Sequence, residues 1–181
     1  AEATELAYEA MRDFSLDYIV ITDLQGNVLI RAYEPEKFVD SVVDQFTVPQ
    51  VLNGEISVGI EKGLDTELSV RAGTPLSDAN DRIIGTILAG YVISSEAFVD
   101  WLKAIINAEV TVFCGNERVM TTLVNSKGQR IIGTKLGIPA IEKKVLKQGE
   151  RYYGKSVIQG MKYAAVYLPI KNAKGDIIGM F

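Results

Sequence analysis

The sequence predicts an α+β protein made of two similar units, each an antiparallel sheet with flanking helices. Three observations lead to this prediction. Matching blocks of sequence recur in the same order, the expected strands are joined by short polar turns, and one amphipathic helix separates the two halves. Strands that follow one another through hairpin turns, with no crossover helix between them, pair in an antiparallel sheet.

The clearest repeat is a pair of strands around a polar turn. Pro75 precedes such a turn and then Ile-Ile-Gly at 83–85, and Pro169 precedes a second turn and the same three residues at 177–179. Two further blocks match upstream, 51–55 with 145–150 and 19–30 with 110–120. Hairpins resemble one another in general, which is the alternative explanation. Three blocks in one order favour an internal duplication of a single supersecondary unit.

The elements of each unit follow from hydrophobic periodicity and turn residues. A helix is expected first, because apolar residues are spaced three and four apart from Ala3 to Phe14. The strands expected in the first unit are 19–23, 28–30, 55–62, 66–76 and 82–93, with a short helical or irregular segment at 36–53. Those of the second unit are 110–114, 118–120, 151–159, 162–171 and 176–181, with such a segment at 138–148.

A helix over residues 95–106 is expected between the units. Ser94 and Ser95 supply an N-cap, and Asn107 suits the C-terminal end. Its apolar stripe is expected to pack against a sheet: Phe98, Trp101, Leu102, Ile105 and Ile106. The boundary falls after this helix, which divides the chain into domains 1–106 and 107–181. Because the sequence opens on a helical pattern and stops within a strand pattern, we expect a fragment of a longer protein.

Composition excludes several classes of function. The 181 residues are 48% hydrophobic and 23% charged, with a net charge of −4 and no basic block, so nucleic acid is not expected as a partner. There is no histidine, which removes imidazole metal ligands and histidine-based acid–base catalysis. The single cysteine, Cys114, cannot form an intramolecular disulfide. We therefore expect no metal and no cofactor. No segment is apolar over a length that spans a membrane.

Several of these segments resemble Cache sensor domains. In the first unit the similar segments are residues 19–29, 68–76, 82–85 and 90–91, and in the second they are 112–113, 118–122, 133–134, 152–154 and 163–169. Each motif alone is loose, but their order, repeated twice, covers nearly the whole chain. The arrangement is similar to the double Cache sensory regions of methyl-accepting chemotaxis proteins and sensor histidine kinases.

The resemblance implies two tandem PAS-like Cache modules, preceded by the end of a long N-terminal helix. It also implies an extracytoplasmic sensor region of a bacterial membrane-anchored receptor, which binds a small molecule such as an amino acid or organic acid, mostly in the first module. A homodimer is compatible with this class. No output domain is visible in the sequence, and the identity of the ligand is not readable from it.

The strands expected in the first unit carry the candidate ligand contacts. Arg71 interrupts an apolar strand, where an unpaired charge is costly, and its planar guanidinium suits a carboxylate. Its alternatives are an ion pair with Glu55 or Glu61, or a position at a solvent-exposed edge. The complete predicted set of ligand-binding residues is Arg31, Tyr33, Ser69, Arg71 and Tyr91.

The second unit offers a weaker set of candidates. Arg118, Tyr153, Lys162 and Tyr163 could line a similar pocket, although tyrosines at strand spacing more commonly pack across strands. Three functions therefore stay open at this point. The first is a small-molecule sensor, the second is a ligand-free scaffold or dimerisation module, and the third is an enzyme. No paired acidic motif supports the third, so no catalytic residue is expected.

Overall fold

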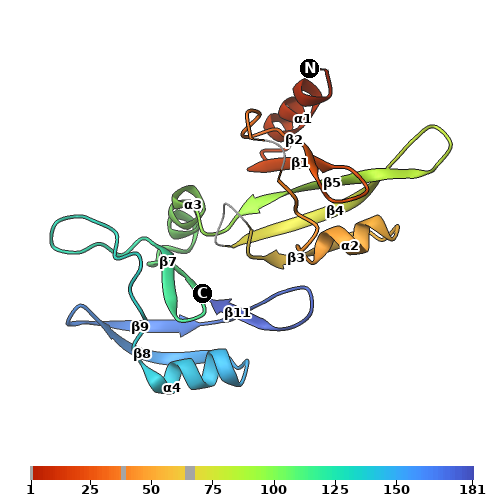
Figure 1. Ribbon diagram of the computed structural model, residues 1–181. Coiled ribbons are helices and arrows are strands. Elements are labelled where there is room, and N and C mark those ends of the chain that lie inside the picture. The colour runs from red at the N-terminus through yellow and green to blue at the C-terminus, as the bar shows by residue number, and fades with distance from the viewer. Residues whose placement is uncertain (1, 38–39, 64–67) are drawn as a thin grey trace. The chain divides into compact units, whose positions relative to one another are not determined.

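A five-stranded antiparallel sheet forms the centre of the first half of the chain (Figure 1). The computed structural model describes residues 2–37, 40–63 and 68–181, and the chain divides into two compact units, Ala1–Val92 and Ile93–Phe181. The sheet order is β2-β1-β5-β4-β3, with every neighbouring pair antiparallel. The strands are β1 (Tyr18–Thr22), β2 (Val28–Arg31), β3 (Ser57–Glu61), β4 (Ser69–Ser77) and β5 (Ile83–Val92). The expected α+β class and antiparallel pairing are confirmed.

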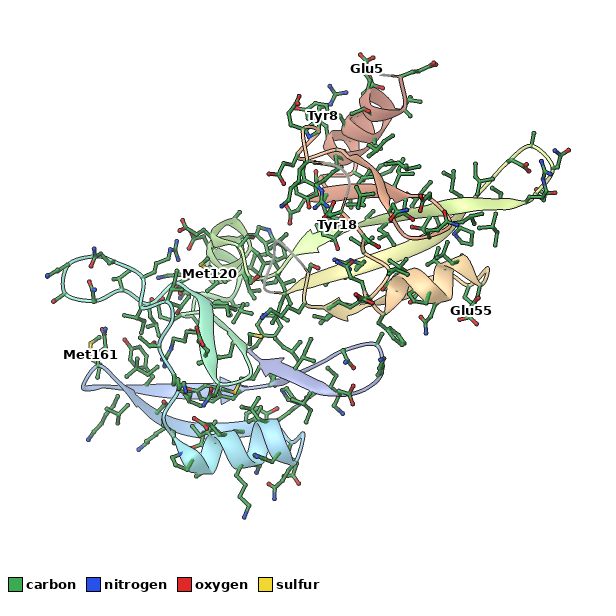
Figure 2. The ribbon with its side chains drawn as sticks, in the orientation of Figure 1. Glu5, Tyr8, Tyr18, Glu55, Met120 and Met161 are labelled. Atoms are coloured by element: carbon green, nitrogen blue, oxygen red, sulfur yellow. The ribbon has the colours of Figure 1, made fainter. Side chains whose placement is uncertain are left out.

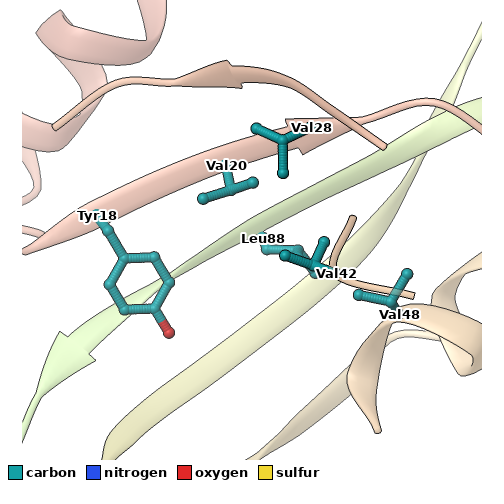
Figure 3. Packing of buried hydrophobic residues seen from close by; sticks show 6 residues of the cluster. All are labelled: Tyr18, Val20, Val28, Val42, Val48 and Leu88. Carbon is teal, nitrogen blue, oxygen red and sulfur yellow. The ribbon is translucent and has the colours of Figure 1, made fainter. Parts of the chain in front are cut away.

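Each face of this sheet is covered by one helix. Alternate residues of β1 point to opposite faces, so Tyr18 and Val20 lie on one side and Ile19 lies on the other. Helix α2 (Thr47–Leu52) packs on the side of Tyr18, which Figure 2 labels, and Figure 3 shows the buried cluster there: Tyr18, Val20, Val28, Val42, Val48 and Leu88. Helix α1 (Glu2–Asp13) covers the opposite side through Ala7, Ala10 and Met11.

The second unit contains a four-stranded antiparallel sheet and a separate two-stranded hairpin. The sheet order is β10-β11-β6-β7, and β8 pairs with β9 in the hairpin. The strands are β6 (Thr111–Cys114), β7 (Glu117–Thr121), β8 (Tyr152–Ile158), β9 (Met161–Tyr167), β10 (Pro169–Lys171) and β11 (Ile177–Met180). Because only Leu168 separates β9 from β10, the path β7-β6-β11-β10/β9-β8 repeats the strand order of the first unit.

A short helical stretch closes the core of the second unit. Helix α4 (Pro139–Glu142) runs directly into a π-helical segment, η1 (Lys143–Lys147). Ile141 and Val145 from this stretch pack with Phe113, Tyr167 and Met180, and all five side chains are buried. The segment 138–148, which was expected to be helical or irregular, therefore forms continuous helical turns that cover the sheet.

Helix α3 (Glu96–Ile106) has the ends that its sequence predicts. The Ser95 hydroxyl accepts a hydrogen bond from the Phe98 N–H, and Asn107 adopts the left-handed conformation with a φ of 51°. The expected packing of its apolar stripe is seen only in part: Phe98 is half-buried, with its ring 6.3 Å from that of Phe181, whereas Trp101 and Ile105 are each 60% exposed. Val99, outside that stripe, is the buried residue of this helix.

Four turns in the described part of the chain are closed by the same pattern of side-chain hydrogen bonds. The side-chain oxygen Oδ1 of the first turn residue accepts hydrogen bonds from the backbone N–H groups two and four residues later. The first residues are Asp23 and Asp78 in the first unit and Asn125 and Asn172 in the second. These turn residues explain why the hairpin positions could be read from the sequence.

The observed element bounds differ little from the expected ones. The expected strand 66–76 is β4, although residues 66 and 67 lie outside the described residues, as do 38 and 39 of the segment 36–53. Packing groups α3 with the second unit, whereas the sequence places the domain boundary after residue 106. That boundary stays a prediction, because packing alone does not define a functional domain. Among the described residues, no helix is long and apolar enough to cross a membrane.

Two glycines allow close approach of neighbouring strands at matching positions of the repeat. A Cβ atom built on Gly85 would lie 1.9 Å from the carbonyl oxygen of Thr22, and one on Gly179 would lie 2.0 Å from that of Phe113. Both contacts are with backbone atoms, which cannot rotate away as a flexible side chain does. Steric crowding by the neighbouring strand therefore explains why the third residue of the Ile-Ile-Gly repeat is glycine.

Gly85→Ala is predicted to lower the free energy of unfolding by about 3 kcal/mol, because β1 and β5 must separate to admit the methyl group. Chemical denaturation of the purified chain measures this change. Gly54→Ala is the control, since its Cβ would meet the Ile83 side chain at an ordinary 3.6 Å and only its φ of 92° is unfavourable. The control is expected to cost about 1 kcal/mol. Equal losses in the two variants would contradict the steric explanation.

Candidate functional site

The predicted residue Arg71 lies in the middle of β4, on the sheet face that α2 covers. It pairs across the sheet with Gly59 on β3 and Gly90 on β5. Neither of these two partners carries a side chain, and the Tyr18 ring lies over Gly90, where a Cβ would be 2.6 Å from its hydroxyl. Arg71 is nevertheless 95% shielded, with a relative exposure of 5%. The sheet thus buries a full positive charge, which requires compensation.

The compensation comes from three side chains. Arg71 Nη1 lies 3.4 Å from Glu61 Oε2 and also donates to the Gln45 side-chain oxygen, while Nε donates to the Tyr18 hydroxyl at 3.3 Å. Of the two acidic partners considered from the sequence, Glu61 is the one observed; Glu55 is exposed beyond α2 (Figure 2). The second terminal nitrogen, Nη2, makes no hydrogen bond within the described residues.

Glu61 connects Arg71 to the start of α2. Its Oε1 accepts a hydrogen bond from the Thr47 N–H at 3.1 Å and another from the Thr47 hydroxyl. Glu61 has a relative exposure of 6% and Thr47 is fully buried. A carboxylate at the beginning of a helix is also favoured by the orientation of the helix dipole. One buried carboxylate therefore joins β3, β4 and α2.

A second buried arginine lies on the same face. Arg31 is 3% exposed; its Nη2 lies 2.6 Å from Asp40 Oδ2, and its Nη1 donates to the Tyr33 hydroxyl at 2.9 Å. Burial by itself lowers the pKa of the Arg31 guanidinium, but the hydrogen bonds and charges of Asp40 and Tyr33 outweigh it, so the pKa is raised. Arg31 is consequently held in its charged form.

Two tyrosines link the arginines into one row. The Tyr18 and Tyr33 rings meet edge to face with centroids 6.2 Å apart, and each ring also lies 5.7 Å from the guanidinium carbon of its neighbouring arginine. We call this set the arginine row: Asp40, Arg31, Tyr33, Tyr18, Arg71 and Glu61. Figure 3 shows the Tyr18 ring at the end of the apolar cluster. The row places two positive and two negative groups along one face.

The remaining predicted residues divide between the two faces. Ser69, two residues before Arg71, is fully buried and accepts a hydrogen bond from the Tyr18 hydroxyl at 3.3 Å, so it belongs with the row. Tyr91 pairs with Val70 and therefore points to the opposite face, where its hydroxyl donates to the Phe14 carbonyl oxygen at 3.3 Å. The structure thus separates Tyr91 from Arg71, contrary to the expectation that both line one pocket.

Three residues that contact the two arginines were not predicted from the sequence. Tyr18 precedes the expected first strand, yet it pairs with Gly90 and so lies beside Arg71. Asp40 and Gln45 come from the irregular segment before α2, where no periodicity indicates direction. Asp40 also carries a buried oxygen, Oδ1, without a hydrogen-bond partner among the described residues. Within those residues no group of three potential metal ligands is found.

The structure brings together two of the four candidates of the second unit: Arg118 and Tyr163 line one cavity, whereas Tyr153 and Lys162 do not line it. Arg118 is buried, donates to Thr134 Oγ1 at 2.9 Å, and lies 5.1 Å from the Phe113 ring. Burial lowers its pKa, and the neighbouring Tyr167 acts in the opposite direction. Tyr153 is 65% exposed and Lys162 is exposed as well, so neither is enclosed in a site.

Comparison with protein families identifies both halves of the chain. A family model described as single Cache domain 3 matches residues 1–97, and a second model with the same description matches residues 91–181. Each match covers more than half of the chain. None of the curated proteins compared with the chain matches it.

Solved structures with the same fold are sensor and ligand-binding regions. The extracellular domain of the putative histidine kinase rpHK1S-Z16 has a TM-score of 0.58 at 13% identity, over 92% of this chain and 71% of that one. The sensor domain of the V. cholerae histidine kinase DctB has a TM-score of 0.54 at 10% identity, over 98% and 75%. An extracellular ligand binding receptor from Desulfohalobium retbaense has a TM-score of 0.57 at 13% identity. The match covers 94% of this chain but only 31% of that protein. At these identities the likeness establishes the fold alone.

Removing both partners of the buried pair is predicted to destabilise the first unit by less than the sum of the two single losses. Arg71→Met leaves Glu61 buried without its cation and is expected to lower the free energy of unfolding by about 3–5 kcal/mol. The double variant with Glu61→Gln, which keeps an acceptor for Thr47, is expected to lose at least about 1 kcal/mol less than the sum of the single variants.

Chemical denaturation of the four proteins gives this double-mutant cycle. Arg82→Met is the matched control, because its pair with Asp78 is made by an arginine side chain that is 74% exposed. That substitution is expected to cost less than about 1 kcal/mol. Additive losses for Arg71 and Glu61 would show that the two residues do not stabilise each other.

Proposed function

The chain belongs to the single Cache domain 3 family, and we propose that it is the ligand-binding sensor region of a signal-transduction receptor of the histidine-kinase or chemoreceptor kind. The proposal includes an extracytoplasmic position and a membrane anchor in the full-length receptor. It assigns the chain a binding role and no catalytic one. The observation that carries it is the arginine row, which keeps two charged guanidiniums and two tyrosine hydroxyls on one sheet face.

We also propose that the two units are tandem PAS-like Cache modules. Three observations support this: the separate family matches to the two halves, the shared strand order, and the matched glycines Gly85 and Gly179. In this proposal residues 1–106 form the membrane-distal module and residues 107–181 the membrane-proximal one. Helix α1 is then the end of a longer helix that leads into the first module.

The ligand proposed for the first module is a small molecule with a carboxylate, such as an amino acid or an organic acid. Arg71 Nη2 is a charged donor without a hydrogen bond inside the described part of the chain, so a carboxylate oxygen can accept from it without displacing Glu61. Ser69, Tyr33 and Arg31 lie on the same face. An ammonium group on the ligand would suit Asp40, whose Oδ1 is buried and accepts no hydrogen bond from any residue that the structure describes.

Signalling in this proposal runs through Glu61. A ligand carboxylate on Nη2 of Arg71 shares the positive charge with Glu61 on Nη1 and so weakens that ion pair, and Glu61 also holds Thr47 at the start of α2. A ligand changes the receptor only if it binds one arrangement more tightly than another. The ligand-sensitive element proposed here is therefore α2 with its attachment to β3.

The second candidate function is a ligand-free scaffold or dimerisation module. The ion pair between Arg71 and Glu61 favours it, because that charge is already compensated inside the protein. A thermal-shift screen of amino acids and small organic acids separates the two functions. A compound that binds only the folded state at a hundred times its dissociation constant adds about 2.7 kcal/mol of stability. Failure of every amino acid and organic acid to raise the melting temperature would favour the scaffold.

With a ligand from that screen, Arg71→Lys is predicted to weaken binding by roughly ten- to a hundredfold, because a charge-assisted hydrogen bond is lost while the charge stays. Isothermal titration calorimetry on the folded variant measures the change. Arg82→Lys, the same substitution at the exposed turn between β4 and β5, is the control and should bind as the unmodified chain does. A loss of affinity in Tyr91→Phe, with Arg71→Lys unaffected, would place the site on the opposite face and overturn the assignment.

A further inference from the structure

The second unit carries most of the positive charge of the chain. Residues 93–181 contain 13 basic and 7 acidic residues, a net charge of +6, whereas residues 1–92 contain 6 basic and 16 acidic residues, a net charge of −10. The net charge of −4 for the whole chain therefore conceals two units of opposite sign. Such an asymmetry between the halves of a sequence indicates a negatively charged partner for the basic half.

The hairpin β8–β9 lies in the part of the second unit where this bias is strongest (Figure 1). From Arg151 to Gly175 the sequence contains five basic residues and no acidic one. These residues are not adjacent, so they form no basic block in the sequence. Strand alternation decides which of them lie together on one face.

The two faces of this hairpin differ in burial and in chemistry. The inner face packs on the core of the second unit, with Tyr167 and Ser156 buried and Tyr152 against the same core cluster. The opposite face consists of three cross-strand pairs whose six side chains are all exposed: Tyr153–Val166, Lys155–Ala164 and Val157–Lys162. We call this set the outer face of the hairpin.

Two lysines of the outer face lie close to each other. Lys155 and Lys162 are on neighbouring strands in adjacent cross-strand pairs, so they are diagonal neighbours. Within the described residues neither lysine forms an ion pair. Like charges at this spacing repel each other. A negatively charged surface placed against the outer face would relieve that repulsion.

The first unit has the same face without the lysines. The corresponding pairs are found by counting back from the prolines of the two matching blocks, and they are Val58–Ala72 for Tyr153–Val166 and Ile60–Val70 for Lys155–Ala164. Lys155 thus takes the place of an isoleucine. The positive charge is a property of the second unit and does not come with the repeated strand pair.

The apolar members of the outer face indicate which anionic partner fits it. Tyr153 is 65% exposed, and Met161, beside the hairpin turn and labelled in Figure 2, is 54% exposed. Tyrosine and aliphatic groups beside lysines are typical of surfaces at the boundary of a lipid bilayer, where the ammonium groups reach the headgroups. The centres of protein interfaces are instead depleted of lysine. Three residue pairs are also too few to bury the roughly 800 Å² per partner of a stable protein interface.

We propose that the outer face of the hairpin docks the second unit onto an anionic lipid bilayer. This inference rests on the proposed function, in which the receptor has a membrane anchor and the second unit is the membrane-proximal module. An anionic surface attracts the unit of charge +6 and repels the unit of charge −10, so both charges favour the same orientation. Weak contact is sufficient, because an anchor keeps the hairpin at a high effective concentration beside the lipid.

The test measures co-sedimentation of the 181-residue chain with vesicles at low ionic strength. Vesicles of equal parts phosphatidylglycerol and phosphatidylcholine are expected to bind the chain, and vesicles of phosphatidylcholine alone are not. Lys155→Gln combined with Lys162→Gln is expected to weaken binding about thirtyfold, since each basic side chain near an anionic surface contributes about fivefold. Salt at about 0.5 M should abolish binding, because it screens exposed charges over a few ångströms.

Lys143→Gln combined with Lys147→Gln is the matched control. Both lysines are exposed, and they belong to η1, which continues the helical stretch that packs on the inner face of the hairpin. This variant therefore loses the same charge at a different place, and it should bind vesicles nearly as well as the unmodified chain. Both double variants change exposed side chains alone, so their melting temperatures should equal that of the unmodified chain.

Absence of binding to phosphatidylglycerol vesicles at low ionic strength would overturn the proposal. Equal losses in the two double variants would also overturn it, because overall charge and not the outer face would then be responsible. A dimer in sedimentation velocity that forms without vesicle binding, and that Lys155→Gln with Lys162→Gln dissociates, would assign the face to the acidic unit of a second copy. The thermal-shift screen reports on the proposed function separately: a chain that responds to an amino or organic acid but binds no vesicles keeps its sensor role and loses this contact.

Discussion

The arrangement of the first unit depends on how one buried arginine is neutralised. Taking a charged side chain out of water costs several kcal/mol, and a protein retains such a group only with a partner and further hydrogen bonds. Arg71 has Glu61, Gln45 and Tyr18, each from a different part of the chain. Meeting this requirement fixes α2 against the sheet, because the carboxylate that faces Arg71 also binds Thr47.

Glycines make this polar network compatible with close packing. A Cβ on Gly90 would lie 2.6 Å from the Tyr18 hydroxyl, and one on Gly73 would lie 2.6 Å from a methyl group of Thr47. The first glycine makes room for the ring that lies beside Arg71, and the second lets α2 approach the sheet. The second unit keeps the strand order but not this network, since its main core cluster is apolar and its buried arginine, Arg118, faces Thr134 and Phe113. Equal topology therefore accompanies unequal chemistry in the two halves.

The sequence was informative wherever local rules decide the outcome. Polar turns and apolar alternation located the strands to within a few residues, and Ser95 and Asn107 marked the ends of α3. Which face of the sheet a side chain lies on was harder to predict. Arg71 and Tyr91 lie on opposite faces because Arg71 pairs with Gly90. This register is set by all the pairs between β4 and β5 together, and neither strand alone determines it. Asp40 and Gln45 could not be found, since irregular segments carry no periodicity that gives their direction. The apolar residues of α3 were expected in a core, but periodicity identifies an apolar face without identifying what covers it.

The turn residues that begin the hairpins give the two units different tolerance to acid. In the first unit Asp23 and Asp78 are ionised acceptors, and hydrogen bonds from Asn27 and from Arg82, respectively, lower their pKa values below the ordinary range. A lowered pKa in the folded state means that the stabilisation is present at neutral pH and is lost as the pH falls through that pKa. Asn125 and Asn172 close the turns of the second unit with amides, which do not titrate. Acidification should therefore loosen the hairpin tips of the first unit before those of the second, which would be visible as earlier loss of amide protection at residues 25, 27, 80 and 82.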